Sequence, residues 1–292
     1  MSSRCEAIGI DLGGTQIKAV VVGGDGEVRR RELRETKDDD SAGFAASIRE
    51  LSDDLGPALP VGLAAPGLVA ADGRSIAHLP GRLGGLEGLD WTDFLGRPVP
   101  VTNDAHASLI GECWLGAARG LSDAILLTLG TGVGGAILAD GRLLRGCIGR
   151  AGHLGHATVD YRSGMISIVG MPGALECMLG NYNIRERTGG RFDTTHSLIV
   201  AAERGEPEAC EIWMESMRTL AAAIASFVNI LDPEAVIIGG GIAQAGDALF
   251  RPLAAELARL EWRPAGHCVR LIPAALGEWA GAIGAARQAL DT

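Results

Sequence analysis

The residues best suited to chemistry in this sequence begin with a glycine-rich turn near its start. The turn lies between two apolar segments and consists of Asp11, Leu12, Gly13, Gly14 and Thr15. Glycine lets the backbone turn sharply and brings its amide groups close to an anion. Thr15 adds a hydroxyl donor, Lys18 adds a positive charge, and Asp11 can hold Mg²⁺ directly or through water. These residues predict a phosphate site, with an ordinary glycine hairpin as the alternative.

A second glycine-rich turn repeats this arrangement about one domain length later. It follows the apolar segment 124–129 and contains Gly130, Thr131, Gly132, Val133, Gly134 and Gly135. Its letters match the dinucleotide fingerprint, but we expect a strand after it instead of a helix, and no acidic residue closes a βαβ unit. We therefore reject NAD binding. The first turn is not a Walker A loop, because no Gly-Lys-Ser/Thr follows it. Two strand–turn–strand units predict an internal duplication with one phosphate loop in each half.

A third glycine cluster, Gly239, Gly240 and Gly241, follows the apolar segment 235–238. Where a strand runs into glycines, a ligand can rest directly on the backbone. The two phosphate-type turns favour this interpretation over the alternative, which is a tight turn from strand to helix.

Asn103 and Asp104 stand where a predicted strand ends and a predicted helix begins. Ligands of α/β proteins bind at this end of the strands. Asp104 can accept the proton of a hydroxyl during phosphoryl transfer, and Asn103 can hold the same substrate. Because Asn and Asp are also favoured helix caps, capping is the competing interpretation for this pair.

Two imidazoles and a carboxylate complete the set of candidate residues. His153 and His156 lie three residues apart in a glycine-rich stretch, and Glu176 lies shortly after a Pro-Gly pair. The histidines can bind a metal, hydrogen-bond a sugar or satisfy a loop, although a pair without further ligands does not favour a metal. Glu176 can accept hydrogen bonds from sugar hydroxyls, or it can be a solvated charge in the first turn of a helix.

The elements that position these residues alternate between strands and helices, which predicts a mixed α/β fold. The apolar patterns predict strands over 7–12, 17–22, 27–34, 61–65, 99–102, 124–129, 136–139, 235–238 and 269–273. They predict helices over 41–55, 104–117, 197–204, 207–230, 245–260 and 278–290. We expect the boundary between two domains near residues 115–123.

Composition and charge narrow the class of protein. Hydrophobic residues make up 47% and charged residues 21% of the 292 residues, which excludes extensive disorder. The formal charge of −10 argues against binding nucleic acid through a broad basic face. No apolar run is long enough to span a membrane, no signal peptide is visible, and the six cysteines form no CxxC pair. We expect a soluble cytoplasmic protein with reduced cysteines and neither a nucleic-acid nor a membrane partner.

Taken together, these motifs resemble the ROK family of bacterial sugar kinases, repressors and uncharacterised proteins, within the actin/hexokinase-like superfamily. The stretches that carry the resemblance are IGIDLGGTQIKAVVV, VTNDAHASLIGECWLGAARG, LLTLGTGVGGAIL, AGHLGH, GALE, DPEAVIIGGGI and LGEWAGAIGAA. They occur in the family's order over almost the whole chain. The resemblance implies two ribonuclease-H-like α/β domains around a central cleft, formed by residues 1–117 with the last helix 279–292, and by residues 118–278. It also implies a homodimer or homotetramer.

The resemblance also implies a role for each candidate residue. The first phosphate loop would be Asp11, Gly13, Gly14 and Thr15, with Lys18 beside it. The second would be Gly130, Thr131, Gly132, Gly134 and Gly135. The adenosine of ATP would lie at Gly239, Gly240 and Gly241. Asp104 would be the general base. Contacts to the sugar would come from Asn103, His156 and Glu176, and from Gly81 in a loop that closes on it.

One departure from the family concerns zinc. Members commonly bind it with one His and three Cys, and here His156 is present while the Cys positions hold Ile166, Ile168 and Ala174. A four-ligand zinc site cannot be built from that set, so we expect no structural zinc. We expect packing to hold this loop instead, through Met165, Ile166, Ile168 and Met171.

A second departure concerns the sugar. Many kinases of the family have Glu where His153 stands, and some that resemble N-acetylmannosamine kinase carry His there. A carboxylate only accepts hydrogen bonds, whereas an imidazole can donate or accept them. The group recognised near C1 and C2 of the sugar therefore stays open.

These observations predict an ATP-dependent, Mg²⁺-requiring kinase that phosphorylates a hexose or hexosamine at the 6-hydroxyl, as a glucokinase does. A kinase of N-acetylmannosamine, N-acetylglucosamine or another amino sugar is the alternative within this class. Outside it stand a sugar-responsive regulator and a sugar-binding protein without turnover. A regulator of this family would carry a winged helix before the first turn, where this sequence already begins a strand. The retained Asp104 and both glycine-rich turns argue against a protein that only binds.

Overall fold

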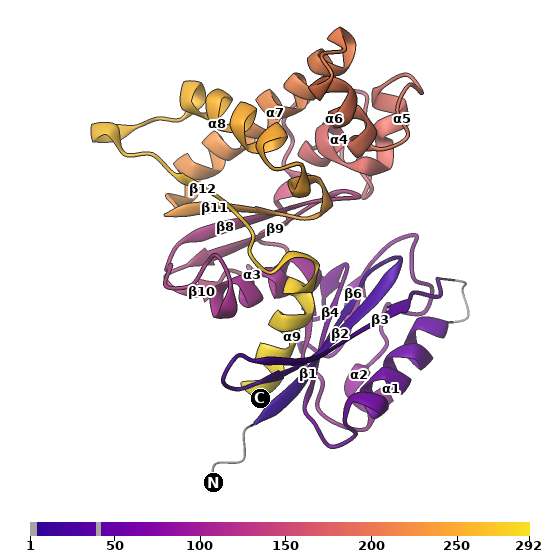
Figure 1. Cartoon of the computed structure of the whole chain (residues 1–292). Coiled ribbons are helices and arrows are strands. Elements are labelled where there is room, and N and C mark those ends of the chain that lie inside the picture. The colour runs from indigo at the N-terminus through magenta and orange to yellow at the C-terminus, as the bar shows by residue number, and fades with distance from the viewer. Residues whose placement is uncertain (1–4, 39–41) are drawn as a thin grey trace. The chain divides into compact units, whose positions relative to one another are not determined.

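Two five-stranded mixed sheets form the framework of the computed structural model, which describes residues 5–38 and 42–292 (Figure 1). The predicted α/β class is confirmed. The chain divides into two compact units. The first unit contains Met1–Gly120, Arg145–Ala151 and Ala275–Thr292, and the second contains Leu121–Leu144 and Gly152–Ala274.

The sheet of the first unit has the strand order β3-β2-β1-β4-β7. Its strands are β1 (Glu6–Leu12), β2 (Gln16–Gly23), β3 (Val28–Glu35), β4 (Val61–Ala65) and β7 (Val101–Asn103). Strand β2 is antiparallel to both of its neighbours, β1 and β3, while β1, β4 and β7 are parallel. The remaining elements are α1 (Gly43–Leu55), β5 (Leu68–Val69), β6 (Ile76–His78), α2 (Trp91–Leu95), α3 (Asp104–Leu115), η5 (Gly277–Trp279) and α9 (Ala280–Leu290).

Both faces of the first sheet are buried, because successive residues of β1 point to opposite sides. Ile8 and Ile10 pack into the core that contains α1, whereas Ala7 packs into the core that contains α9. Gly9 allows α9 to approach this closely, since a Cβ there would lie 1.8 Å from the carbonyl oxygen of Ala282. Figure 1 shows α9, the last helix of the chain, lying along this sheet.

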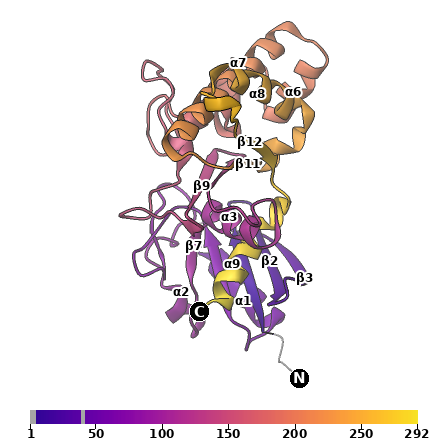
Figure 2. The same cartoon turned by 90° about the vertical axis from the view of Figure 1, so that its left-hand side faces the viewer.

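The sheet of the second unit has the strand order β10-β9-β8-β11-β12. Its strands are β8 (Ala124–Leu129), β9 (Val133–Ala139), β10 (Arg142–Leu143), β11 (Ala235–Gly239) and β12 (Arg270–Pro273). The helices are η1 (Leu154–His156), α4 (Leu175–Leu179), η2 (Asn181–Asn183), α5 (Ile184–Arg187), α6 (Thr195–Glu203), α7 (Pro207–Leu231), η3 (Gly241–Ala245), α8 (Asp247–Leu260) and η4 (Pro264–Gly266). The long helix α7 packs beside α6 and α8 above the apolar residues of β8 and β11 (Figure 2).

The two sheets share one topology, which the predicted internal duplication requires. In each, a glycine hairpin joins the central strand to an antiparallel neighbour, and parallel strands follow on the other side. The first and second glycine-rich turns occupy the same place in their sheets, between β1 and β2 and between β8 and β9. The prediction that a strand follows each turn is confirmed.

The second turn is shorter than we predicted. Gly134 and Gly135 belong to β9, where they pair with Thr128 and Leu127 of β8, so the turn is limited to residues 130–132. Antiparallel pairing continues through these glycines because their backbone groups complete the ladder. In the described part of the chain, no helix is long and apolar enough to cross a membrane.

Candidate active site

The first glycine hairpin presents backbone amides, because a neighbouring residue engages its carbonyl groups. The Thr36 hydroxyl donates to the carbonyl of Gly13 at 2.7 Å, and the Thr36 amide donates to the carbonyl of Thr15 at 2.9 Å. The Gly13 amide donates to the carbonyl of Gln16. Within residues 5–38 and 42–292, the amides of Gly14 and Thr15 have no hydrogen-bond partner. Two adjacent amides in a tight turn can hold an anion.

Asp11 and Lys18 lie opposite each other at the start of this hairpin. Burial, and after it the charge of Asp104, raises the pKa of Asp11 to about 7, while the charge of Lys18 acts in the opposite direction. The Lys18 ammonium lies 4.0 Å from a carboxylate oxygen of Glu278. A half-buried carboxylate in a negative surrounding fits a divalent cation, because the cation relieves the repulsion.

Asn103 and Asp104 play different parts at the start of α3. The side-chain oxygen of Asn103 accepts from the amides of Ala105 and His106, and its Nδ2 donates to the carbonyl of Gly67. The capping interpretation is therefore confirmed for Asn103, which keeps one amide proton for a ligand. Asp104 also accepts from Ala105, but its side chain is exposed at the helix N-terminus, where a negative charge is favoured.

The loop with Gly81 belongs to the same unit as Asp104. Gly81 is exposed, has a φ of +77° and has open space around its Cα. The loop packs against Gly67, because a Cβ on Gly67 would lie 3.0 Å from the Cβ of Leu79 in the loop. Asn103 thus holds, through Gly67, a segment that touches this loop.

In the second hairpin, as in the first, carbonyl groups are hydrogen-bonded within the described part of the chain while two adjacent amides are not. The amides of Asn181 and Tyr182 donate to the carbonyls of Gly130 and Thr131 at 3.0 and 2.9 Å. Among the described residues, the amides of Thr131 and Gly132 have no hydrogen-bond partner. Different segments of the chain therefore prepare each hairpin to present adjacent amides to an anion.

A cavity of about 570 Å³ opens beside the second hairpin, lined by Gly130, Thr131 and Gly241 among others. Of the third glycine cluster, Gly241 alone reaches this cavity. Gly239 ends β11. Gly240 packs against Leu129, because a Cβ on Gly240 would lie 2.3 Å from the carbonyl oxygen of Leu129. The turn interpretation therefore describes Gly240, with a φ of +86°, while Gly241 faces open space.

Sequence reasoning missed the opposite wall of this cavity. That wall comes from the start of α6 and from η3, and includes Thr194, Thr195, His196 and Gln244. The hydroxyl of Thr195 is buried and has no hydrogen-bond partner in the described part of the chain, so it can serve a ligand. In the structure Thr194 caps α6 in a capping box with Ser197, and such a cap marks the start of a helix but not a binding wall.

His153, His156 and Glu176 gather next to the second hairpin. Glu176 is buried and accepts from the amides of Ile168 at 3.1 Å and Val133 at 3.5 Å. The Nδ1 atom of His156 lies 3.5 Å from Glu176, and the rings of His153 and His156 stack with centroids 6.0 Å apart. The alternative interpretation of Glu176 as a solvated charge is therefore wrong.

The loop at the family's zinc position is not held as we expected. The side chains of Ile166, Ile168 and Met171 are exposed, so the prediction that they pack is wrong, and Met165 alone is half-buried. Hydrogen bonds hold the loop instead, because its polar groups find partners within it and on η2. Within the described residues, no group of three or more His, Cys, Asp or Glu side chains is placed to hold a metal ion.

Tyr182 of η2 contacts this loop through its hydroxyl. Its hydroxyl donates to the carbonyl of Ile166 at 3.2 Å and lies 3.3 Å from the sulfur of Cys177. Burial is the main cause that raises the pKa of Tyr182, so its hydroxyl stays protonated and can donate. Within the loop, the hydroxyl of Ser167 accepts from the amide of Met171 at 3.0 Å.

The structure thus gathers the candidate residues in two groups. The first unit holds Asp11, Gly13, Gly14, Thr15, Lys18, Gly81, Asn103 and Asp104. The second unit holds Gly130, Thr131, Gly132, Gly134, Gly135, His153, His156, Glu176, Gly239, Gly240 and Gly241.

Two sheets of one topology, each with an amide-presenting hairpin beside its central strand, define an α/β protein of the actin/hexokinase-like class. Comparison with known proteins confirms the resemblance found in the sequence. The model of the ROK family matches residues 7–292, so the chain belongs to this family.

Its similar proteins include sugar kinases of two specificities. The glucokinase of Thermotoga maritima is 33% identical, over 97% of this chain and 96% of its own. The N-acetylmannosamine kinase of Escherichia coli is 30% identical, over 96% of each chain. A crystal structure of a ROK family glucokinase from Streptomyces griseus, in complex with glucose and AMPPNP, has a TM-score of 0.82 at 29% identity and covers 98% of this chain and 100% of that one.

Proposed function

We propose that this protein is an ATP-dependent kinase that transfers a phosphoryl group to the 6-hydroxyl of a hexose or hexosamine. The observation that carries the proposal is the state of Asp104. Its neighbour Asn103 caps α3, and the exposed Asp104 carboxylate stands at the end of β7 in the unit that holds the first hairpin. A kinase needs such a base beside an anion-binding loop.

In the proposed reaction, Asp104 takes the proton of the sugar hydroxyl as its oxygen attacks the γ-phosphorus of ATP. The bond between the γ-phosphorus and the bridging oxygen breaks, and ADP leaves with the electron pair. The amides of Gly14 and Thr15 stabilise the negative charge of the transferred group, since they need no reorganisation to point at it. Mg²⁺ held near Asp11 would supply positive charge to the phosphates.

We assign the nucleotide to the cavity of the second unit. The amides of Thr131 and Gly132 suit a phosphate, and Gly241 with the hydroxyl of Thr195 offers open and polar surface for the adenosine. The AMPPNP bound by the Streptomyces griseus glucokinase supports ATP as the donor.

We assign the sugar hydroxyls to His153, His156 and Glu176, with Asn103 and Gly81 as further contacts. Glu176 fits this role because its buried carboxylate has further acceptor capacity beside the two amides that it binds. The relatives phosphorylate glucose or N-acetylmannosamine according to their names, and the imidazole at position 153 is compatible with either a hydroxyl or an acetamido group. A kinase of N-acetylmannosamine, N-acetylglucosamine or another amino sugar is the alternative.

The test is a coupled ADP-release assay with ATP and Mg²⁺ over glucose, mannose, fructose, allose, glucosamine, kanosamine, N-acetylglucosamine and N-acetylmannosamine. One sugar with clearly higher kcat/KM supports the proposal. No ADP from any sugar, with bound sugar detected by titration calorimetry, supports a binding protein instead. His153→Glu should change the rank order of the sugars, and His267→Glu, at an exposed position of the same unit, should not. We also propose a homodimer or homotetramer, which light scattering measures.

A further inference from the structure

The guanidinium of Arg82 lies directly against the first glycine hairpin. If Gly14 carried a Cβ, that atom would lie 2.0 Å from Nη2 of Arg82 and 3.1 Å from its Cζ. The guanidinium therefore fills the space that a side chain at this position would take. It is half-buried there, beside the amides of Gly14 and Thr15 that have no partner in the described residues.

Both neighbours of Arg82 have a positive φ, and that of Leu83 is unusual. Gly81 has a φ of +77°, and Leu83 has a φ of +49°, which a residue with a side chain rarely adopts. Leu83 stays in this conformation because its side chain is only 1% exposed and its amide donates to the Asp38 carboxylate at 2.9 Å. Such strain persists where the surroundings impose it, and it commonly occurs at functional sites. Here it places Arg82 over Gly14.

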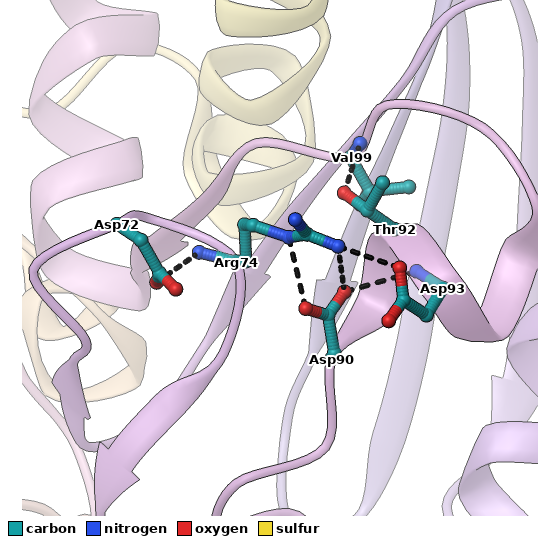
Figure 3. Close-up of polar contacts among 6 residues, drawn as sticks. All are labelled: Asp72, Arg74, Asp90, Thr92, Asp93 and Val99. Atoms are coloured by element: carbon teal, nitrogen blue, oxygen red, sulfur yellow. Dashed lines mark hydrogen bonds and ion pairs between the residues drawn. The ribbon is translucent and has the colours of Figure 1, made fainter.

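A second arginine of the same unit shows how a structural arginine is bound. Arg74 forms ion pairs with Asp90 and Asp93 at 2.9 and 2.6 Å, and Asp90 also caps α2 (Figure 3). The hydrogen bond to Asp90 is the main cause that raises the pKa of Arg74. Arg82, by contrast, makes no hydrogen bond or ion pair to any residue in 5–38 and 42–292.

We propose that Arg82 is a phosphate-binding residue that contacts the phosphoryl group transferred at the first hairpin. This inference rests on the proposed kinase function. A guanidinium presents a planar set of donors that matches two oxygens of a phosphoryl group, and its charge is always present. While the sugar oxygen bonds to phosphorus and the bond to ADP breaks, Arg82 donates to the non-bridging oxygens. The proton still passes to Asp104.

The test compares Arg82→Ala and Arg82→Lys with the matched control Arg74→Ala. We expect Arg82→Ala to lower kcat by about 10²-fold or more, because the substitution removes the positive charge that contacts the transferred phosphoryl group. Its melting temperature, its affinity for the sugar and its affinity for AMP should stay near those of the wild type, whereas its affinity for ATP should fall. Arg82→Lys should retain part of kcat, and millimolar guanidinium chloride should restore part of the turnover of Arg82→Ala. Arg74→Ala should lose thermal stability, keep kcat and gain nothing from guanidinium.

Two results overturn the inference while the wild type remains an active kinase. One is an unchanged kcat in Arg82→Ala. The other is a loss of kcat in Arg82→Ala that comes with a lower melting temperature and a lower affinity for AMP, and that guanidinium does not rescue. If the wild type releases no ADP with any sugar, the kinase proposal fails by itself. The ratio of ATP to AMP affinity then still decides: a ratio lowered in Arg82→Ala supports a phosphate contact, and an unchanged ratio excludes it.

Discussion

Asp104 lies near enough to Asp11 for the charge of one carboxylate to act on the other. Burial is the larger cause and the charge of Asp104 the second cause that raise the pKa of Asp11 to about 7. The unfolded chain has the ordinary value of 3.8. The native protein therefore holds a proton on Asp11 up to about neutral pH, whereas the proposed Mg²⁺ site needs this carboxyl charged.

A pH dependence of stability follows from this pKa. Because the folded state holds its proton more tightly, the stabilising contribution of Asp11 is complete below pH 3.8 and is lost as the pH rises to about 7. The full loss corresponds to about 4 kcal/mol at most. Without Mg²⁺, Asp11→Asn should therefore be more stable than the wild type at pH 8, with little difference near pH 4.

Urea unfolding of the two proteins over this pH range measures the effect. In an Asp104→Asn background, the pH-dependent difference in stability between Asp11→Asn and Asp11 should be smaller, since the neighbouring charge is then absent. A free-energy difference between Asp11→Asn and wild type that stays constant with pH would contradict the raised pKa.

Removing the proposed base should separate catalysis from folding. Asp104→Asn should lower kcat by roughly 10²-fold or more, with little change in melting temperature, because Asn103 still caps α3. Asn103→Ala should cost about 1 kcal/mol of stability through the lost cap, and should raise the KM for the sugar that Asn103 is proposed to contact. The ADP-release assay and thermal unfolding distinguish the two variants. Near-normal turnover of folded Asp104→Asn would rule out its role as the base.

The order of the loop at the family's zinc position should depend on the hydroxyl of Tyr182. Tyr182→Phe removes the hydrogen bond to the Ile166 carbonyl, which costs about 1 kcal/mol. It also loosens the loop whose Ile168 amide binds Glu176. We expect a higher KM for the sugar and an unchanged KM for ATP.

The control for this loop is Tyr161→Phe, because Tyr161 is 76% exposed and its hydroxyl contacts only the neighbouring Arg162 among the described residues. Zinc added to either variant should not restore the sugar KM. Equal sugar KM values for Tyr182→Phe and wild type would show that other contacts hold the loop.

A buried carboxylate anchors the segment that leads into the last helix. Glu112 of α3 is fully buried and accepts from the amides of Ala117, Ala275 and Leu276 at 2.6 to 3.1 Å. In Glu112→Gln the side-chain NH2 group would face backbone amides that are also donors, so one of these hydrogen bonds cannot form. We therefore expect the free energy of unfolding to fall by about 2–4 kcal/mol. Glu50→Gln, at an exposed position of α1, should change stability by less than about 0.5 kcal/mol. Chemical denaturation compares them, and equal midpoints would contradict an anchoring role.

Local patterns were sufficient to predict much of this protein. Apolar runs and glycine turns predicted both hairpins and the alternation of strands with helices, because backbone freedom and side-chain periodicity depend on near neighbours in the chain. The same patterns located Asp104 at the end of a strand. Element ends were less accurate: α8 begins at Asp247, and the start of the helix predicted from residue 41 falls outside the described residues, which show it from Gly43.

Sequence alone determined which residues this protein can use for chemistry, and the tertiary structure decided how they are used. Thr36 turns the carbonyls of the first hairpin away, Glu176 is buried between the amides of Val133 and Ile168, and Arg82 lies over Gly14. The contacts of Thr36 with Gly13, of Glu176 with Val133 and of Arg82 with Gly14 join residues that are distant along the chain. They depend on how sheets, helices and loops pack, which no local pattern of residue types records.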